Sequence, residues 1–303
     1  MKCAIATREF PRKDAYNIRM LKRPLGKTGE LLSVIGFGGI LVMKETTAEA
    51  ARLVSLAVDL GINYFDVAPT YGNAEQMLGP ALEPHRKSVF LACKTTERSK
   101  DGAAGELRAS LGRLRTDHVD LYQMHGLTEP GEVEKALGPG GAIEAFVEAR
   151  QAGLARHLGF SAHTEEAALA AMERFPFDTV LFPLNIYSWH VGRFGHRVVP
   201  RAVSLGMGVL ALKSLAKRPW GKDEPHDGFK TWYAPVESYE DARIGVRFTL
   251  SLPITAAVTP GHERHLLWAV KAAEEFTPLP EAESAQLALS VPDAAPIFQA
   301  PES

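Results

Sequence analysis

This 303-residue chain has no long apolar runs, only two cysteines and no surplus of positive charge. No apolar stretch approaches the roughly 20 residues that cross a bilayer, and the polar opening segment Met1–Asn17 has no signal-peptide core. The two cysteines, Cys3 and Cys93, are too few for a disulfide framework or a zinc site made mainly of thiolates. Lysine and arginine number 34 against 36 acidic residues, a formal charge of −2, whereas nucleic-acid and anionic-membrane binders carry a basic surplus. We therefore expect a soluble cytoplasmic protein without a nucleic-acid or membrane partner, and the sequence carries no signal for an oligomeric state.

Two motifs that would mark other enzyme classes are missing as well. An open, doubly wound sheet that binds a dinucleotide would show Gly-x-Gly-x-x-Gly after its first strand, and Gly36-Phe-Gly-Gly39 lacks the third glycine. A metal-dependent barrel hydrolase would usually show His-x-His on the first strand, and none occurs here. His262 and His265 are spaced like ligands on a helix, but no third ligand suggests itself.

What the chain does contain is a regular alternation of short apolar runs with amphipathic stretches. The runs are apolar throughout rather than alternating with polar residues, which is typical of parallel strands buried on both faces. Eight runs are expected as strands: Ser33–Gly36, Asn63–Val67, Ser88–Cys93, Val119–Met124, His157–Phe160, Thr179–Leu184, Gly208–Leu212 and Thr255–Val258. The stretches between them predict helices at Thr47–Leu60, Ala74–Leu82, Asp101–Leu114, Ala142–Gln151, Thr164–Arg174, Val198–Leu205, Ser238–Thr249 and Glu263–Phe276.

Eight strands that alternate with eight helices over roughly 250 residues predict an α/β fold of the (β/α)8 TIM-barrel type, with the doubly wound sheet as the alternative. The segment Thr46-Thr-Ala-Glu49 is a capping box for the first helix, and Asn73 is the expected cap of the second.

The two ends of the chain differ from this pattern. Residues 1–22 are expected to form a tail, and Gly26 and Gly29 after it predict a short N-terminal hairpin. The proline- and alanine-rich segment Pro278–Ser303 predicts a short helix and a tail over the barrel. No linker interrupts the middle of the chain, so we expect one barrel domain over residues 23–303.

Side chains suited to proton chemistry follow three successive apolar runs. Asp66 and Tyr71 follow the second run, Lys94 ends the third, and His125 ends the fourth. In a barrel the C-terminal ends of the strands form one rim, so we expect these four to lie together. Each alone has an ordinary structural explanation, such as a turn aspartate or a surface lysine. Their joint occurrence at successive strand ends is poorly explained in that way.

The four residue types together make an acid that works at neutral pH. A tyrosine hydroxyl titrates near pH ~10, and a neighbouring lysine ammonium lowers that pKa. A buried aspartate would hold the lysine charged and oriented, while a histidine could donate a hydrogen bond to a substrate oxygen. Such a set can protonate a carbonyl oxygen while a hydride arrives at the carbon.

The segment Gly61-Ile-Asn-Tyr-Phe-Asp-Val-Ala-Pro-Thr-Tyr-Gly-Asn-Ala-Glu75 closely resembles the signature of the aldo-keto reductases, and the order of motifs agrees from Arg23 to Glu275. The resemblance implies a TIM barrel, an NAD(P)H cofactor and a small aldehyde or ketone as substrate, in the carbonyl reductase and alcohol dehydrogenase class. It places the catalytic tetrad on Asp66, Tyr71, Lys94 and His125, with Tyr71 as the general acid.

The resemblance also implies a cofactor site, with departures. The implied residues are Gly38, Asp66, Ser161, Asn185, Leu212, Lys213, Ser214, Leu215, Pro260, Gly261 and Arg264. Leu212-Lys-Ser-Leu-Ala216 resembles the Met-Lys-Pro-Leu-Ala motif of a bacterial branch of the family. Ala162 stands where many relatives have an asparagine, Leu181 where they have a glutamine, and Leu212 where an aromatic ring stacks on the nicotinamide. Arg264 suits a 2′-phosphate, so NADP(H) is favoured and NAD(H) is possible.

Two alternatives stay open at this point. The departures from the cofactor pattern would also suit a barrel with weak or vestigial turnover that serves as a nucleotide-sensing or partner-binding subunit. The aromatic residues Trp220, Phe229, Trp232 and Tyr233, together with Trp189 and His190, could line a substrate pocket or merely pack a long loop onto the barrel. Cys93 beside Lys94 could be a redox-active thiol, but we expect it to be a small buried residue.

Overall fold

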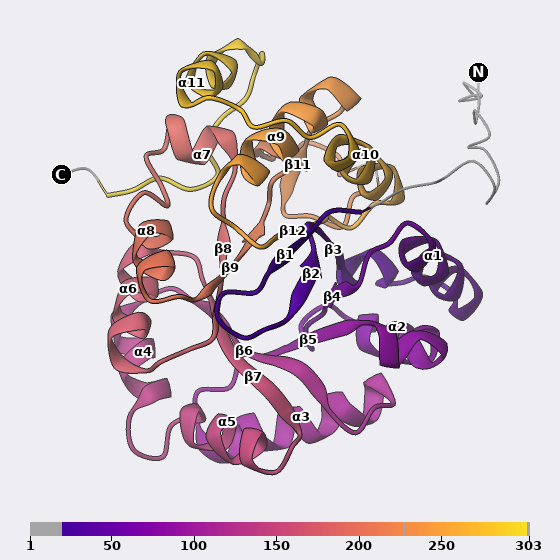
Figure 1. Ribbon diagram of the computed structural model, residues 1–303, viewed down its shortest axis with the longest axis vertical. Coiled ribbons are helices and arrows are strands. Elements are labelled where there is room, and N and C mark those ends of the chain that lie inside the picture. The colour runs from indigo at the N-terminus through magenta and orange to yellow at the C-terminus, as the bar shows by residue number, and fades with distance from the viewer. Residues whose placement is uncertain (1–19, 227, 302–303) are drawn as a thin grey trace.

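Eight parallel strands close into a barrel at the centre of this computed structural model, which describes residues 20–226 and 228–301 (Figure 1). The barrel runs in the order β12-β3-β4-β5-β6-β7-β8-β9, so the predicted TIM barrel is confirmed. Its strands are β3 Ile35–Gly38, β4 Tyr64–Asp66, β5 Phe90–Thr95, β6 Val119–Leu127, β7 Ala155–Ala162, β8 Thr179–Pro183, β9 Gly208–Leu212 and β12 Ala256–Val258.

All eight predicted helices are present around the barrel: α1 Thr47–Asp59, α2 Ala74–Leu82, α3 Lys100–Leu114, α5 Ala142–Gln151, α6 Glu165–Arg174, α8 Val198–Ser204, α9 Tyr239–Ser251 and α10 Glu263–Glu274. Elements that the sequence pattern did not indicate are α4 Pro130–Leu137, α7 Ile186–His190, the strands β10 Ala216–Pro219 and β11 Tyr233–Pro235, and two 3-10 helices, Gly39–Val42 and Glu83–Ser88. None of the helices within the described ranges has both the length and the apolar character needed to cross a membrane.

Two local predictions need correction. The first barrel strand begins at Ile35 rather than Ser33, because Ser33 belongs to β2 and pairs with Lys22 of the hairpin. Asn73 precedes α2 but does not cap it, since its Oδ1 accepts a hydrogen bond from the Lys44 backbone N–H at 2.7 Å instead. The cap of α1 is as expected, with Thr46 Oγ1 accepting from the Glu49 N–H at 3.2 Å.

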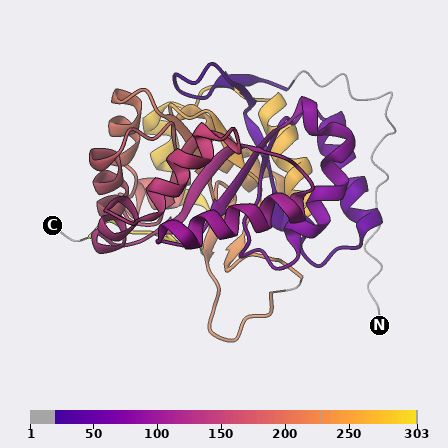
Figure 2. The same ribbon diagram turned by 90° about the horizontal axis from the view of Figure 1, so that it is seen from below.

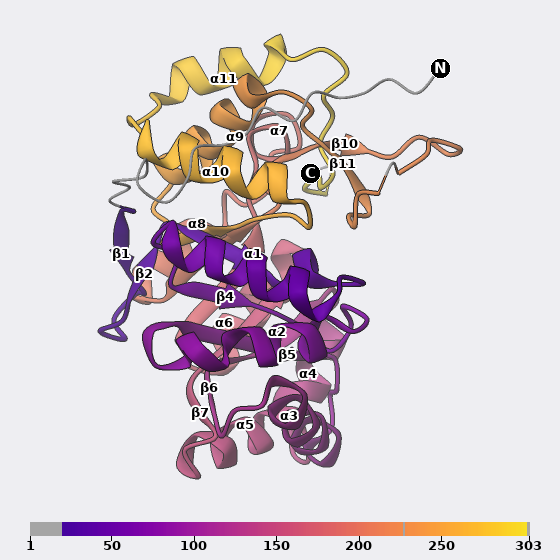
Figure 3. The ribbon, with the colours of Figure 1, turned by 90° about the vertical axis from the view of Figure 1, so that its right-hand side faces the viewer.

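The predicted hairpin, β1 Lys22–Pro24 and β2 Leu31–Ser33, lies across one end of the barrel (Figures 2 and 3). Leu25 and Leu32 of this hairpin are buried in one cluster with the side chains of the lumen. The β10–β11 segment, Ala216–Pro235, projects from the opposite end, and we call it the strap. The first nineteen residues of the predicted N-terminal tail lie outside the described residues.

The C-terminal helix α11, Glu281–Ser290, is present as predicted and packs beside the barrel on α7 and α9 (Figure 1). Beyond it, the backbone N–H of Ala300 donates to the carbonyl of Gly192, and that of Ala295 to the carbonyl of Lys217. These bonds fix the last described residues against the loop after β8 and against the strap.

Alternation along each strand divides the side chains between the lumen and the helices. Lumen residues form one apolar cluster, with Tyr64, Phe90, Ala92, Leu121, Leu181, Leu210, Ala256 and Val258 as its barrel members. The neighbouring strand positions, such as Phe65, Cys93 and Tyr122, belong to the larger cluster between strands and helices. Because the side-chain period of a strand is two, every residue two positions beyond a lumen residue also faces the lumen.

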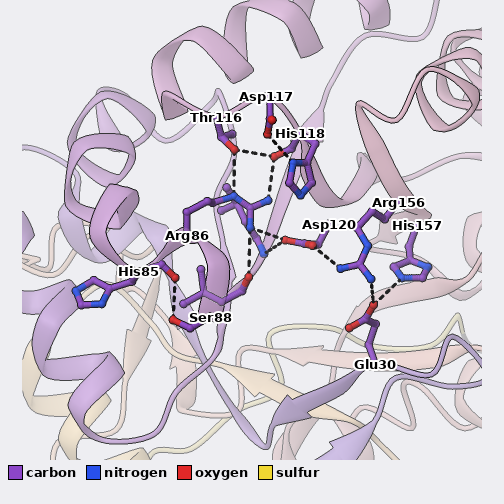
Figure 4. Close-up of polar contacts among 12 residues, drawn as sticks. Glu30, His85, Arg86, Ser88, Thr116, Asp117, His118, Asp120, Arg156 and His157 are labelled. Atoms are coloured by element: carbon purple, nitrogen blue, oxygen red, sulfur yellow. Dashed lines mark hydrogen bonds and ion pairs between the residues drawn. The ribbon is translucent and has the colours of Figure 1, made fainter.

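A cluster of charged side chains ties the hairpin to the N-terminal ends of the strands (Figure 4). The buried carboxylate of Asp120 accepts from Arg86 Nη1 and from Arg156 Nη1, each at 2.9 Å, and from the Leu91 backbone N–H at 2.8 Å. Arg156 also donates to Glu30 of the hairpin, which His157 contacts as well. The buried carboxylate therefore depends on two cations of very different exposure.

We expect Arg86→Met to lower the free energy of unfolding by about 3 kcal/mol, because it removes the buried cation from a carboxylate only 4% exposed. Arg156→Met is the matched control and should cost about 0–1 kcal/mol, since the Arg156 side chain is 50% exposed. Urea unfolding followed by circular dichroism measures both. Equal losses for the two variants would contradict this account of the cluster.

Candidate active site

All four predicted catalytic residues line one cavity of about 360 Å³ in the barrel. Asp66 lies two positions beyond Tyr64 on β4, Lys94 two beyond Ala92 on β5, and His125 four beyond Leu121 on β6. Because side chains alternate along a strand, these three residues face the same lumen as the apolar ones and lie at its C-terminal end. The described residues that line the cavity are Gly38, Ile40, Asp66, Thr70, Tyr71, Lys94, His125, Ser161, His163, Leu181, Leu212, Lys213, Lys230, Thr231, Trp232, Tyr233, Val258, Thr259 and Pro260.

A buried ion pair forms the floor of the cavity. Lys94 Nζ donates to Asp66 Oδ1 and, at 3.1 Å, to the backbone carbonyl of Val67. Asp66 Oδ2 accepts from the Tyr64 hydroxyl at 3.2 Å and from Gln123 Nε2 at 3.0 Å. Burial acts to lower the pKa of Lys94, but the charge and hydrogen bond of Asp66, together with Tyr71 and Cys93, hold that pKa above its usual value. Lys94 is therefore a fixed positive charge.

Tyr71 reaches the cavity from the loop after β4. Lys94 Nζ lies 5.4 Å from the centre of the Tyr71 ring, and the His125 ring meets that ring edge-on at 5.8 Å. Enclosure of the hydroxyl raises the pKa of Tyr71, and the charge of Lys94 opposes this without overcoming it. The lysine thus acts in the direction expected from the sequence, but burial is the larger effect, and Tyr71 is a neutral phenol at pH 7.

His125 is a neutral imidazole at physiological pH. Burial, followed by the positive charge of Lys94, lowers the pKa of His125 to about 3. Thr70 Oγ1 lies 3.4 Å from its Nδ1. A neutral imidazole keeps one N–H, so His125 can donate a hydrogen bond to an oxygen in the cavity without adding a charge.

The residues predicted to bind a cofactor fall into two groups. Gly38, Asp66, Ser161, Leu212, Lys213 and Pro260 line the cavity, whereas Asn185, Ser214, Leu215, Gly261 and Arg264 are not among its lining residues. Asn185 instead caps α7, because its Oδ1 accepts from the Ser188 N–H at 2.8 Å. Its Nδ2 donates to the Lys213 carbonyl at 3.3 Å, which supports Lys213 at the left-handed φ of 68°.

Beyond the cavity, α10 and its preceding turn offer groups for an anion. A Cβ at Gly38 would lie 2.1 Å from the Thr259 carbonyl oxygen, so only glycine allows β3 to approach this turn. Arg264 stands in the first turn of α10, with its guanidinium 5.0 Å from the Trp268 ring and 5.7 Å from Phe229. No carboxylate within the described ranges forms an ion pair with it. This unpaired guanidinium and the helix start suit a phosphate group.

Some residues of the site were not predicted. Gln123 holds Asp66 in place and could have been found by counting two positions back from His125 along β6. His163, two beyond Ser161, also lines the cavity. Lys230 and Thr231 of the strap line it as well, and no local sequence signal indicates how that segment folds back.

The other side chains singled out in the sequence are divided between the cavity and packing contacts outside it. Trp232 and Tyr233 line the cavity, but Phe229 packs on His262 and His265, and Trp220 packs on His226. No set of three histidine, cysteine or acidic side chains within the described ranges could hold a metal ion. Cys93 is buried as predicted, with Sγ donating to Glu75 Oε1 at 3.3 Å.

Comparison with known proteins finds relatives of this chain. A model described as the Aldo/keto reductase family matches residues 34–231. The uncharacterized oxidoreductase YqkF of Bacillus subtilis is 35% identical over 156 residues, or 47% of this chain and 49% of that protein. The 6-dehydroglucose reductase of Novosphingobium aromaticivorans is 34% identical over 222 residues, covering 64% and 68% of the two chains. The match thus spans about half the length of YqkF.

Among solved structures, the holo form of the aldo-keto reductase AKR11C1 from Bacillus halodurans is similar to this chain with a TM-score of 0.71. The two are 25% identical, and the match covers 92% of this chain and 98% of that one.

We expect Asp66→Asn to cost about 3–5 kcal/mol of unfolding free energy, because it leaves the buried Lys94 without its counter-charge. The double variant Asp66→Asn/Lys94→Met should be more stable than the single variant, since both charges are gone. Chemical unfolding of the two single variants and the double variant measures the coupling. Additive losses would contradict a buried ion pair.

Proposed function

The chain belongs to the aldo/keto reductase family, and on that premise we propose that it reduces an aldehyde or ketone to an alcohol with a nicotinamide dinucleotide. The observation that carries the proposal is the meeting of Tyr71 with Lys94, Asp66 and His125 in one cavity. Three of these residues stand on neighbouring strands, and the fourth follows the first of them. A purely structural role would not need a neutral phenol, a fixed ammonium and a neutral imidazole to face one space.

The residues of this chain would hold the cofactor at two places. Ser161, Leu181 and Leu212 would form the wall for the nicotinamide, a more apolar wall than the family pattern implies. Arg264 and the start of α10 would receive the adenosine phosphate end. A guanidinium with no carboxylate partner among the described residues favours NADP(H) over NAD(H) there. When bound, the reduced nicotinamide supplies a hydride.

In the proposed reaction the chain's part is to place and move one proton. His125 would donate a hydrogen bond to the substrate carbonyl oxygen and thereby polarise it. Tyr71 would then give its hydroxyl proton to that oxygen as the carbon accepts the hydride, which leaves the alcohol and a phenolate. Lys94, kept charged by Asp66, would stabilise this phenolate. In alcohol oxidation the same groups act in reverse.

We predict that Tyr71→Phe lowers kcat for reduction by about 10²- to 10⁴-fold, because the general acid is lost. The Kd for NADPH, measured by fluorescence titration, should stay within a few fold. Tyr233→Phe removes one hydroxyl from the same cavity and serves as the control, with a far smaller change in kcat. A Tyr71→Phe enzyme that keeps most of its activity would rule out this assignment.

The protonation states of Tyr71 and His125 also predict how kcat depends on pH. Because burial raises the pKa of Tyr71, the acid stays protonated through neutral pH, and kcat for reduction should fall only at alkaline pH. Alcohol oxidation needs the ionised tyrosine and should rise as pH increases. With the pKa of His125 at about 3, no loss of activity should appear between about pH 5 and 8. Profiles of kcat against pH test this, and a histidine-like limb near pH 6.5 that His125→Gln abolishes would contradict it.

A further inference from the structure

A second charged group faces the reaction cavity and takes no part in the proposed proton transfer. Lys213 follows β9 and His163 follows β7, and both line the cavity. Lys213 Nζ lies 3.2 Å from His163 Nε2. An ammonium has only donors, so Nε2 accepts this hydrogen bond and His163 carries its proton on Nδ1.

The charge of Lys213 has no counter-ion within the described ranges. The residue is only 7% exposed, and its ammonium lies 4.8 Å from the Trp232 ring and 4.6 Å from the Phe298 ring. Aromatic faces compensate a buried cation only partly. Burial lowers the pKa of Lys213 well below its ordinary value, and an adjacent anion would restore the charged form.

The other charges of the cavity are already paired. Asp66, the one carboxylate among the described lining residues, accepts from Lys94, Tyr64 and Gln123. Lys230 donates to Glu45 Oε1 and to the Leu41 carbonyl, each at 2.7 Å. Among the described residues that line this cavity, Lys213 is therefore the cation that still lacks an anionic partner.

The barrel order shows on which side that partner would lie. Strands β7, β8, β9 and β12 are consecutive, so Lys213 reaches from β9 back across β8 to His163 after β7. Arg264 and the α10 start follow β12, on the other side of β9. The ammonium thus points away from the phosphate groups proposed for the cofactor and towards the side of Ser161 and His125, whose pKa its charge helps to lower.

We propose that Lys213, held by His163, is a subsite for the carboxylate of the substrate, so that this chain prefers aldehydes or ketones that bear a carboxylate. This inference rests on the proposed carbonyl reduction and names the substrate class of that site. Trp232 and Phe298 close the subsite on its apolar side and strengthen the charge interaction by excluding water.

The test compares two benzaldehydes whose para substituent is either an ionised carboxylate or its uncharged methyl ester. Wild-type enzyme should show a kcat/KM about 10- to 100-fold higher for 4-carboxybenzaldehyde than for methyl 4-formylbenzoate, as expected for one charged hydrogen-bonded pair. Lys213→Met should abolish that preference, because it lowers kcat/KM for the acid at least tenfold more than kcat/KM for the ester. Lys213→Arg should keep most of the preference. Lys135→Met, which removes an exposed lysine on α4, should leave both values unchanged.

Further measurements separate this proposal from its alternatives. If Lys213→Met weakens NADPH binding and lowers kcat/KM equally for acid and ester, Lys213 serves the cofactor diphosphate and the proposal is overturned. His163→Gln is a second variant if Lys213→Met does not fold, and it should reduce the preference for the acid in part. Isothermal titration of 4-(hydroxymethyl)benzoate into NADPH-loaded enzyme reports on the subsite without turnover, because the alcohol and the reduced cofactor cannot react. If wild type binds this acid but reduces neither aldehyde, the proposed function fails while the subsite stands; binding that Lys213→Met leaves unchanged rejects the subsite.

Discussion

The pairing of Lys94 with Asp66 inside the barrel is the interaction on which the rest of the site depends. Two charges removed from water are tolerated only when each is matched and hydrogen-bonded. Here Tyr64 and Gln123 donate hydrogen bonds to the carboxylate, and the Val67 carbonyl accepts one from the ammonium. The pair and these partners come from three adjacent strands and the segment that follows β4, so the pair also fixes how those strands meet. The charge of Lys94 acts on Tyr71 and His125 in addition to their burial, and it acts to lower the pKa of both.

The barrel could be predicted because its signals are local. Each buried strand is a short apolar run and each helix has its own periodicity, so all eight pairs were found from the sequence. The tetrad could be predicted because it stands at strand ends, where position along the chain determines position in space. The roles of these residues in the reaction remain predictions that the proposed variants test.

Predictions failed where a long-range contact decides the local structure. Asn73 has the side chain of a helix cap, but the backbone N–H of Lys44 competes for it, and no local pattern shows that competition. Ser33 belongs to an apolar run, yet its pairing with Lys22 places it in the hairpin. The strap reaches the cavity because Lys230 bonds to Glu45, nearly two hundred positions earlier in the chain. The sequence around His163 does not indicate its contact with Lys213, because Lys213 follows a strand two places away in the barrel.

Strand alternation in β6 has a consequence for how this protein can change over evolutionary time. Leu121, Gln123 and His125 face the lumen, while Tyr122 and Met124 face the helices. Deletion of a single residue early in β6 would exchange the two sets and turn Tyr122 and Met124 inward, removing His125 and the support of Asp66 in one step. Insertions and deletions within this strand are therefore viable only in pairs, whereas the strap can vary in length without moving the tetrad. Lineages descended from this chain should diversify in the strap and keep the spacing of β6 constant.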